Sequence, residues 1–315
     1  MRTAIPSIVA LLLAAPMGGC SVRPLPEDVT GVSTVAITKR IQCEAREALD
    51  RISVNILRNF GDDRAKKLAD LVDMGRVNAS ELVDRKYLGT YDVGRGEILF
   101  RTYTLSAVTF DFKFDIAEEN DNSTRADFRL PLVGGLFTVG ANAGAKLGRK
   151  NNRKFQLTKS FYELHRLDKE ECKVIEAGAS NVAYPITGRI GLQEVFETFV
   201  QLDSGSNSDP SPANRYTDTL TFTTTLSGGT TPTLTLDPLN VRALRVAGAN
   251  ATFKASRTDE HQVAVAIARG ELVRSFAAAI LDAKASSRII ADELRVENIL
   301  ENQTRGLSVL NDFGR

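Results

Sequence analysis

The chain has 315 residues, with 40 Lys and Arg against 39 Asp and Glu, which gives a formal net charge of +1 at pH 7. This balance excludes the strong single-sign field that gathers nucleic acid or acidic substrates, so we expect no nucleic-acid partner. An aromatic content of 7%, with no Trp, argues against an aromatic-lined sugar cleft. The length allows one large domain or two small ones.

The N-terminal segment has the layout of a secretory signal. Residues 1–19 contain one Arg, a short apolar run and then small residues. The run is shorter than the roughly 20 apolar residues of a membrane-spanning helix. The tetrad MGGC at 17–20 resembles the lipobox of bacterial lipoproteins, with Met17 where that family prefers Leu. The resemblance implies that Cys20 becomes a lipid-bearing N-terminus, and that Ser21 after it favours the outer membrane. The alternative is an ordinary cleaved signal beside a coincidental cysteine.

Residues 20–33 are predicted to form a short polar tether, because closely spaced prolines favour an extended chain. Lipidation would use Cys20 and leave Cys43 and Cys172. An exported protein meets an oxidising compartment, where the two remaining cysteines can pair. They are either a disulfide or two independent thiols, because sequence alone does not supply the geometry of the bond.

Apolar residues at helical spacing predict a first helix over residues 34–60. Two shorter helices are expected in an insertion at 62–88. The apolar period then changes to two, which is typical of a half-buried strand. Turns are expected at 118–124 and 149–154. Strands are expected at 108–116, 128–133, 136–147 and 154–164.

The second half repeats this order of elements. Apolar spacing predicts a helix that begins near Leu192 and ends at a polar loop from Asp203. The chain is expected to finish with two helices, at 271–284 and 288–303. Between these helical regions, strands are expected at 218–226, 233–236, 241–253 and 261–268.

Two short segments occur twice. The sequence GANA at 140–143 recurs at 248–251, and in both copies a Lys and an Arg follow at the same distance. The sequence ITKRI at 37–41 is echoed by ITGRI at 186–190, and each opens a predicted helix. We interpret this as an internal duplication; chance recurrence among small, common residues is the alternative.

The sequence therefore predicts an α+β fold of two tandem modules, each a helix plus an antiparallel sheet. The first module covers 34–170 and contains the helical insertion, and the second covers 183–270. A linker at 171–182 joins them, and 271–315 forms the C-terminal helices and tail.

Part of the first module is similar to a known family of domains. The helix IQCEAREAL at 41–49, the strand VTFDFKF at 108–114, a Gly-rich hairpin and a closing strand follow one another. This order resembles the trypsin-co-occurring domains found beside trypsin-like proteases in bacterial conflict systems. The resemblance implies a non-catalytic adaptor.

Alternation along the repeated strands places four polar side chains on the face opposite a row of small residues. These are Asn142 and Lys146 in the first copy and Asn250 and Lys254 in the second. They form either a solvated outer face or two equivalent sites for an anionic group or a partner. The small residues on the other face are expected to let a helix pack closely against the sheet.

No motif in the sequence indicates a particular chemical reaction. His165 and His261 have no partner at metal-ligand spacing and are expected at the surface. The serine elbow of acyl hydrolases is absent from the sequence. Residues 89–96 lack the Lys of a phosphate loop, and 203–214 lack the Gly and Glu of a calcium loop. We therefore predict no catalytic residue, no metal and no cofactor.

The sequence favours a lipid-anchored periplasmic protein at the outer membrane, acting as a non-catalytic binding or scaffold protein. Its expected partners are the membrane, through the N-terminal lipid, and a protein of the envelope. The alternatives are an envelope enzyme with dispersed catalytic residues, or an adaptor for a protease or defence system.

Overall fold

The structure is a computed structural model that describes residues 24–60, 62–82, 103–132, 135–177, 185–205, 215–235, 245–270 and 275–312. The predicted signal peptide, Cys20 and parts of the predicted insertion and linker lie outside these residues. Side chains are described for most of this range but not at the hairpin end of the first two strands or beyond Leu300.

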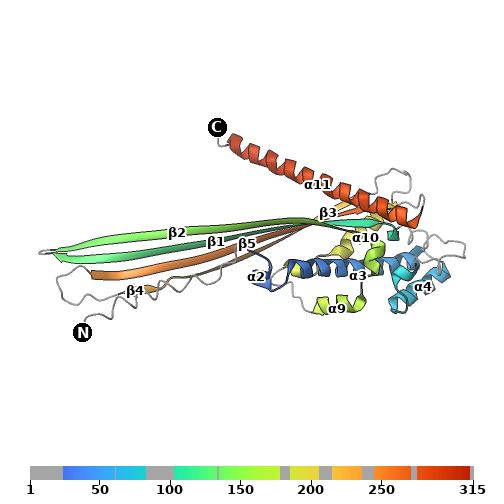
Figure 1. The fold of residues 1–315 in the computed structure, drawn as a ribbon, viewed down its shortest axis with the longest axis horizontal. Coiled ribbons are helices and arrows are strands. Elements are labelled where there is room, and N and C mark those ends of the chain that lie inside the picture. Colours follow the sequence, from blue (N-terminus) through green and yellow to red (C-terminus); the bar gives the residue numbers. More distant parts are fainter. Residues whose placement is uncertain are drawn as a thin grey trace. The chain divides into compact units, whose positions relative to one another are not determined.

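The chain is an α+β protein, as predicted (Figure 1). The sheet has the strand order β2-β1-β5-β3, and β4 pairs antiparallel with β5. The elements are α2 (Glu27–Thr30), α3 (Thr34–Phe60), α4 (Asp63–Asp73), α5 (Ala79–Leu82), β1 (Ala107–Leu132), β2 (Gly135–Ser160), α8 (Phe161–His165), α9 (Lys169–Ala177), η1 (Pro185–Thr187), α10 (Leu192–Gly205), β3 (Arg215–Thr230), β4 (Thr233–Thr235), β5 (Arg245–Ala268) and α11 (Phe276–Asp312).

The chain divides into two compact units. Unit 1 contains residues 1–29, 116–151 and 225–258, and unit 2 contains 30–115, 152–224 and 259–315. Strands β1, β2, β3 and β5 each contribute residues to both units. The units therefore do not follow the boundaries of the two predicted modules.

The main hydrophobic core lies entirely in unit 2. The alternating residues Phe110, Phe112 and Phe114 of β1 are fully buried, and the ring of Phe112 stacks on Phe155 of β2 with centroids 4.8 Å apart. The predicted apolar face of α3 is buried as well, against α4 and α10. One side of α11 packs on β5, where Ile290 and Ala291 are buried.

Unit 1 is built differently, because its strand residues are largely exposed on both faces. Val139 and Leu147 of β2 are 42% and 60% exposed, and Phe253 of β5 is 43% exposed. The expected helix does not cover the small-residue row: residues 138–148 are exposed throughout. That expectation is wrong for this part of the sheet, and the row faces outward.

Several predicted element boundaries are also wrong. The expected turns at 118–124 and 149–154 lie inside β1 and β2, and β5 is continuous where two strands were expected. Residues 161–164 form part of α8, because Ser160 and Glu163 make a capping box that starts a helix. The two C-terminal helices are one helix, α11. None of the described helices combines the length and the hydropathy that a membrane crossing requires.

Candidate functional site

Two arginines from different strands bind one carboxylate in unit 1. Arg149 Nη2 of β2 donates to Glu118 Oε2 at 2.6 Å, and Arg257 Nη1 of β5 donates to Glu118 Oε1 at 3.0 Å. The side chains of Glu118 and Arg257 are only 16% and 8% exposed. Charges this far from water need opposite charges and hydrogen bonds to be tolerated, and each oxygen of Glu118 has such a partner.

The same cluster holds the N-terminal segment. Arg257 Nη2 donates to the carbonyl oxygen of Leu25 at 2.8 Å, and Asn151 Nδ2 donates to that of Pro24 at 2.8 Å. Because both contacts are made to backbone oxygens, they fix the path of the chain itself. We call Glu118, Arg149, Asn151 and Arg257 the tether clasp.

The segment that enters the clasp is itself ordered by local contacts. The backbone N–H of Leu25 donates to Asp28 Oδ2 at 2.8 Å, and α2 follows directly. The rings of Pro24 and Pro26 are buried. Pro24 and Leu25 of the predicted tether are therefore bound to the sheet of unit 1.

The four predicted polar-face residues all lie in unit 1, on strands β2 and β5. Lys146 Nζ makes an ion pair with Glu119 Oε2 of β1 at 3.1 Å, with the two side chains 66% and 58% exposed. Asn250 of β5 lies opposite Thr233 of β4. An ion pair this exposed contributes little to stability. Asn142, Lys146 and Lys254 are exposed, and Asn250 is half-buried.

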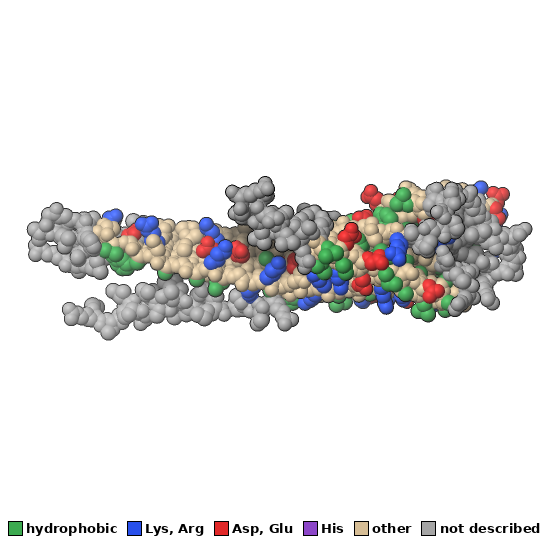
Figure 2. Space-filling view, turned by 90° about the horizontal axis from the view of Figure 1, so that it is seen from above, with side chains coloured by type: hydrophobic (Ala, Val, Ile, Leu, Met, Phe, Trp, Pro, Cys, Tyr) green, Lys and Arg blue, Asp and Glu red, His purple; other side chains and the backbone are tan. Residues whose placement is uncertain are grey.

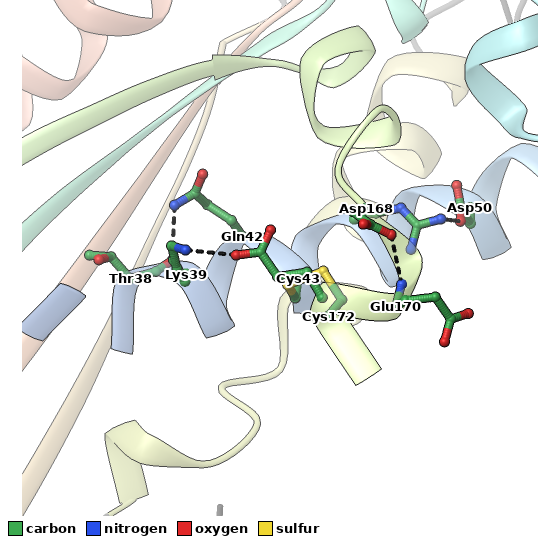
Figure 3. Close-up of a disulfide and its surroundings, with 10 residues drawn as sticks. Thr38, Lys39, Gln42, Cys43, Asp50, Asp168, Glu170 and Cys172 are labelled. Atoms are coloured by element: carbon green, nitrogen blue, oxygen red, sulfur yellow. Dashed lines mark hydrogen bonds and ion pairs between the residues drawn. A yellow bond between two sulfur atoms is a disulfide. The ribbon is translucent and has the colours of Figure 1, made fainter. Parts of the chain in front are cut away.

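Cys43 of α3 and Cys172 of α9 form a disulfide, with their Cα atoms 5.4 Å apart (Figure 3). An ion pair between Lys39 Nζ and Glu171 Oε1 at 2.7 Å connects the same two helices. Disulfides persist in oxidising compartments and are rare in the cytosol. A disulfide in the folded protein is therefore typical of a protein that resides in an oxidising compartment.

The two histidines are not at the surface as expected, because His165 and His261 are only 3% and 1% exposed. His165 Nδ1 lies 2.9 Å from Asp50 Oδ1 of α3, and Arg46 Nη2 lies 3.2 Å from Asp50 Oδ2. The His261 ring packs edge-on against Phe114. In the described part of the chain, no group of three His, Cys, Asp or Glu side chains could hold a metal ion.

A cavity of about 260 Å³ lies in unit 2 between α11 and the strands. Its wall contains Asp111 of β1 and Arg295 of α11, joined by two hydrogen bonds of 3.0 and 2.5 Å. The hydrogen bonds that Arg295 donates to Asp111 raise the pKa of Arg295. The volume is below the roughly 300–1,000 Å³ of typical small-molecule sites, and neither histidine lines it.

Sequence reasoning identified Arg149 and Arg257 as equivalent positions of a repeat but did not foresee that they share Glu118. It missed Asn151 entirely, having placed it in a turn. The repeated Lys-x-x-Arg spacing was the available signal for the arginines. Nothing in the sequence marks Glu118 among its acidic neighbours.

The protein is thus an α+β protein in which the strands of unit 1 bind the N-terminal segment of the same chain through the tether clasp. Residues 23–279 match the family described as "Uncharacterised protein y4kA". The chain is also 32% identical over 278 residues to the "Uncharacterized protein y4kA" of Sinorhizobium fredii (strain NBRC 101917 / NGR234), which covers 85% of this chain and 83% of that protein. The chain belongs to the y4kA family, and the matched range contains the whole clasp and both bonded cysteines.

Proposed function

We propose that this chain is a lipid-anchored periplasmic protein of the outer membrane, acting as a non-catalytic binding or scaffold protein. The tether clasp carries the proposal. Cys20 precedes Pro24 by four residues, and a fully extended chain of four residues spans about 14 Å between Cα atoms, so Cys20 cannot lie far from Pro24. Acyl chains on Cys20 would thus be held close to the sheet of unit 1 rather than at the end of a loose linker.

The disulfide supports export, since two cysteines far apart in sequence pair in the folded protein. The lipobox-like tetrad and the disulfide are independent features that favour the same compartment. The mixed charges of the surface agree with binding of a specific partner rather than with attraction of a highly charged ligand such as nucleic acid. On the face shown in Figure 2, acidic and basic side chains are interspersed among the described residues.

A protein partner is proposed for the outward side of α11. Leu281, Ile289, Val296 and Leu300 recur at intervals that place them on one side of the helix, and they are 66%, 53%, 56% and 58% exposed. Ile290 and Ala291 face the sheet instead. A helix with apolar residues on two sides can pack on its own sheet and still offer a surface to another protein.

We also propose that the chain arose by tandem duplication. The two GANA segments lie near the start of β2 and of β5, and the arginine that follows each of them binds Glu118. The helices α3 and α10, which contain or follow the repeated ITxRI sequences, contact one another. A shared carboxylate between equivalent arginines is the arrangement expected of two related strands in one sheet.

The anchor is tested by metabolic labelling with a fatty-acid analogue. The wild type and Ser21→Ala are expected to incorporate label and to fractionate with the outer membrane, whereas Cys20→Ala is expected to lose the label. Ser21→Ala is the matched control because it changes the adjacent residue and retains the cysteine. Label of wild-type strength on Cys20→Ala would rule out this anchor.

The binding role is tested by crosslinking and pull-down from an envelope fraction. Wild type and Leu281→Asp, with its charge on the outward side of α11, are compared with Glu297→Asp on the same helix. We expect a defined envelope protein to be captured by wild type and Glu297→Asp and lost with Leu281→Asp. Equal capture by all three chains would place the binding surface elsewhere.

A further inference from the structure

The cavity beside Arg295 lies wholly within unit 2 and is lined mainly by polar side chains. Strands β1, β2 and β5 form its floor, and α11 forms its wall. Its volume of about 260 Å³ is below the range of drug-sized ligands, so a ligand that fits it must be small.

The cavity begins where close packing of α11 on the sheet ends. Ser287 is buried and shares a hydrogen bond of 2.9 Å with Thr109 of β1. About two to three helical turns later, Leu294, Arg295 and Asn298 are only half-buried, and all three line the cavity. This part of α11 therefore forms a wall beside the sheet instead of packing tightly on it.

One pair of opposite charges in the lining is satisfied within the protein. Arg295 donates from Nε and Nη2 to the two carboxylate oxygens of Asp111, at 3.0 and 2.5 Å. A bidentate pair of this kind uses the strongest donors and acceptors of both groups and fixes their geometry. Asp111 and Arg295 therefore close one side of the cavity and leave the other charged groups to a ligand.

Two lysines lie next to each other on the floor. The register of β1 and β2 is marked by two side-chain hydrogen bonds, between Thr109 and Thr158 and between Asp115 and Asn152. Lys113 lies two residues before Asp115, and Lys154 lies two residues after Asn152, so in this antiparallel register the lysines are directly opposite on one face. Like charges placed opposite each other are unfavourable, and an anionic group between them removes the repulsion.

Lys154 and Glu260 are the charged groups of the lining that have no partner. Lys113 Nζ pairs with Asp115 Oδ2 at 3.0 Å, whereas Lys154 and Glu260 make no ion pair with any other residue that the structure describes. Strand β1 lies between their strands, so their backbones are about 10 Å apart. A ligand that carries both a carboxylate and an ammonium can bridge these two charges.

The wall of the cavity adds an apolar contact. Leu294 is half-buried and Ile299 is 46% exposed, and both line the cavity from α11. Small-molecule sites combine apolar side chains with a few polar groups that fix the orientation of the ligand. The lining thus offers cations, a carboxylate and an aliphatic surface to one small molecule.

We propose that this cavity binds a free amino acid with an aliphatic side chain. Its carboxylate lies between the ammonium groups of Lys113 and Lys154, its own ammonium contacts Glu260, and its side chain packs on Leu294 and Ile299. The site involves neither the lipid anchor nor the outward side of α11. It therefore goes beyond the proposed function, and the two can fail separately.

The test is isothermal titration calorimetry of the purified full-length chain with L-leucine and two analogues. Isocaproate has the same skeleton without the amine, and isoamylamine has it without the carboxylate. We expect saturable binding of leucine and at least about tenfold weaker binding of each analogue, since each loses one charge-assisted contact. Absence of leucine binding, or equally tight binding of either analogue, overturns the proposal.

Charge-removing variants assign the two ends of the ligand. Lys154→Met should weaken leucine binding about tenfold without weakening isoamylamine, which has no carboxylate to lose. Glu260→Gln should weaken leucine similarly without weakening isocaproate. Lys150→Met removes another exposed lysine of β2 outside the cavity, and it should bind leucine like the wild type. An equal loss with Lys150→Met and Lys154→Met would place the bound leucine elsewhere and overturn the proposal.

The apolar wall is tested with Ile299→Ala. It should weaken leucine several-fold and leave L-alanine unaffected, because the shorter side chain of alanine does not reach α11. All of these variants should keep the melting temperature of the wild type, since residues 154, 260 and 299 are exposed. Unchanged leucine affinity in Ile299→Ala would contradict the proposed orientation of the ligand.

Discussion

At the scale of single residues, buried carboxylates connect parts of the chain that are far apart in sequence. Glu44 of α3 accepts hydrogen bonds from the backbone N–H groups of Ile190, Gly191 and Leu192 at 2.8, 2.8 and 3.0 Å. Leu192 is the first residue of α10 and the other two directly precede it, so the carboxylate lies at the N-terminus of the helix, where a negative charge is favourable. Gly191 has a φ of 90°, a conformation that glycine adopts readily.

Such contacts explain why helices and strands were easier to predict from the sequence than the side chains that interact with one another. The repeated ITGRI segment correctly indicated that a helix follows residue 190, and Gly191 is a natural break before it. The capping group, however, comes from Glu44, and a carboxylate on a long helix has many equivalent neighbours in the sequence. The same limit applies to Asp50, whose partner His165 was expected at the surface.

Glu163 provides a prediction at this scale. Burial acts to raise the pKa of its carboxyl, but the hydrogen bond from Lys284 and that from the backbone N–H of Ser160 outweigh burial, so the pKa is lowered from its ordinary 4.5. A carboxyl with a lowered pKa in the folded state stabilises the protein above pH 4.5. That contribution is lost as the pH falls through the folded-state pKa.

Replacing Lys284 by Met should therefore lower the free energy of unfolding at pH 7 by about 0.5 kcal/mol, the usual size for a partly exposed pair. The difference from wild type should shrink as the pH falls well below 4.5. Urea unfolding over this pH range measures it. Lys173→Met, which removes an exposed pair with Glu170, is the control and should change little. A loss that is the same at every pH would contradict this explanation.

At the scale of elements, the disulfide and an ion pair attach α9 to α3. Cys172 is buried against α3, whereas Val174 is 77% exposed. The disulfide joins residues 129 apart in sequence, so it restricts a large part of the unfolded chain (Figure 3). In the loop-entropy description, a bond that closes so large a loop stabilises the folded state by about 4–5 kcal/mol.

The double variant Cys43→Ser, Cys172→Ser should accordingly lose up to about 5 kcal/mol of unfolding free energy. Urea unfolding with and without a reductant, in the Cys20→Ala background, measures the loss. Wild-type cysteines treated with reductant should behave like the double variant, and the double variant should not respond to reductant. A response of the double variant would show that reduction acts somewhere other than this bond.

Helices and strands with one regularly spaced apolar side were predicted well, whereas strand segments without such spacing were not. Helix α3 was predicted with its full bounds because its apolar spacing is regular. The middle parts of β1 and β2, at 118–124 and 149–154, were assigned to turns because their polar residues show no alternation that marks burial. The continuous helix α11 was divided at residues 285–287, yet Ser287 is buried and shares a hydrogen bond of 2.9 Å with Thr109 of β1.

At the scale of the whole molecule, the α+β class could be read from the sequence, but α9 lies where a linker was predicted. The strand order could not be read from the sequence, since β1 pairs with β5 across more than a hundred residues. The division into two units could not be predicted from the sequence either, because each unit combines three separate stretches of chain. Periodicity reports on local burial and carries no information about which distant strand becomes a neighbour.

The location of the core predicts unequal tolerance to substitution. Phe112→Ala, at a fully buried ring stacked on Phe155, should lower the free energy of unfolding by about 3–5 kcal/mol. Ala251→Ser, in the exposed sheet of unit 1, should change it by less than about 0.5 kcal/mol. Urea unfolding of the two variants measures both values. A comparable loss from Ala251→Ser would mean that the core extends into unit 1.

The passage of β1, β2 and β5 through both units has a consequence for backbone exchange with deuterated water. Protection of an amide depends on the free energy of the opening that exposes it, and openings are least costly where few apolar contacts are lost. Within one continuous strand, the amides of residues 107–115 should therefore retain hydrogen far longer than those of 116–132. Secondary structure alone would assign these amides a single rate, so a step in exchange along β1 would map the border of the core at single-residue precision.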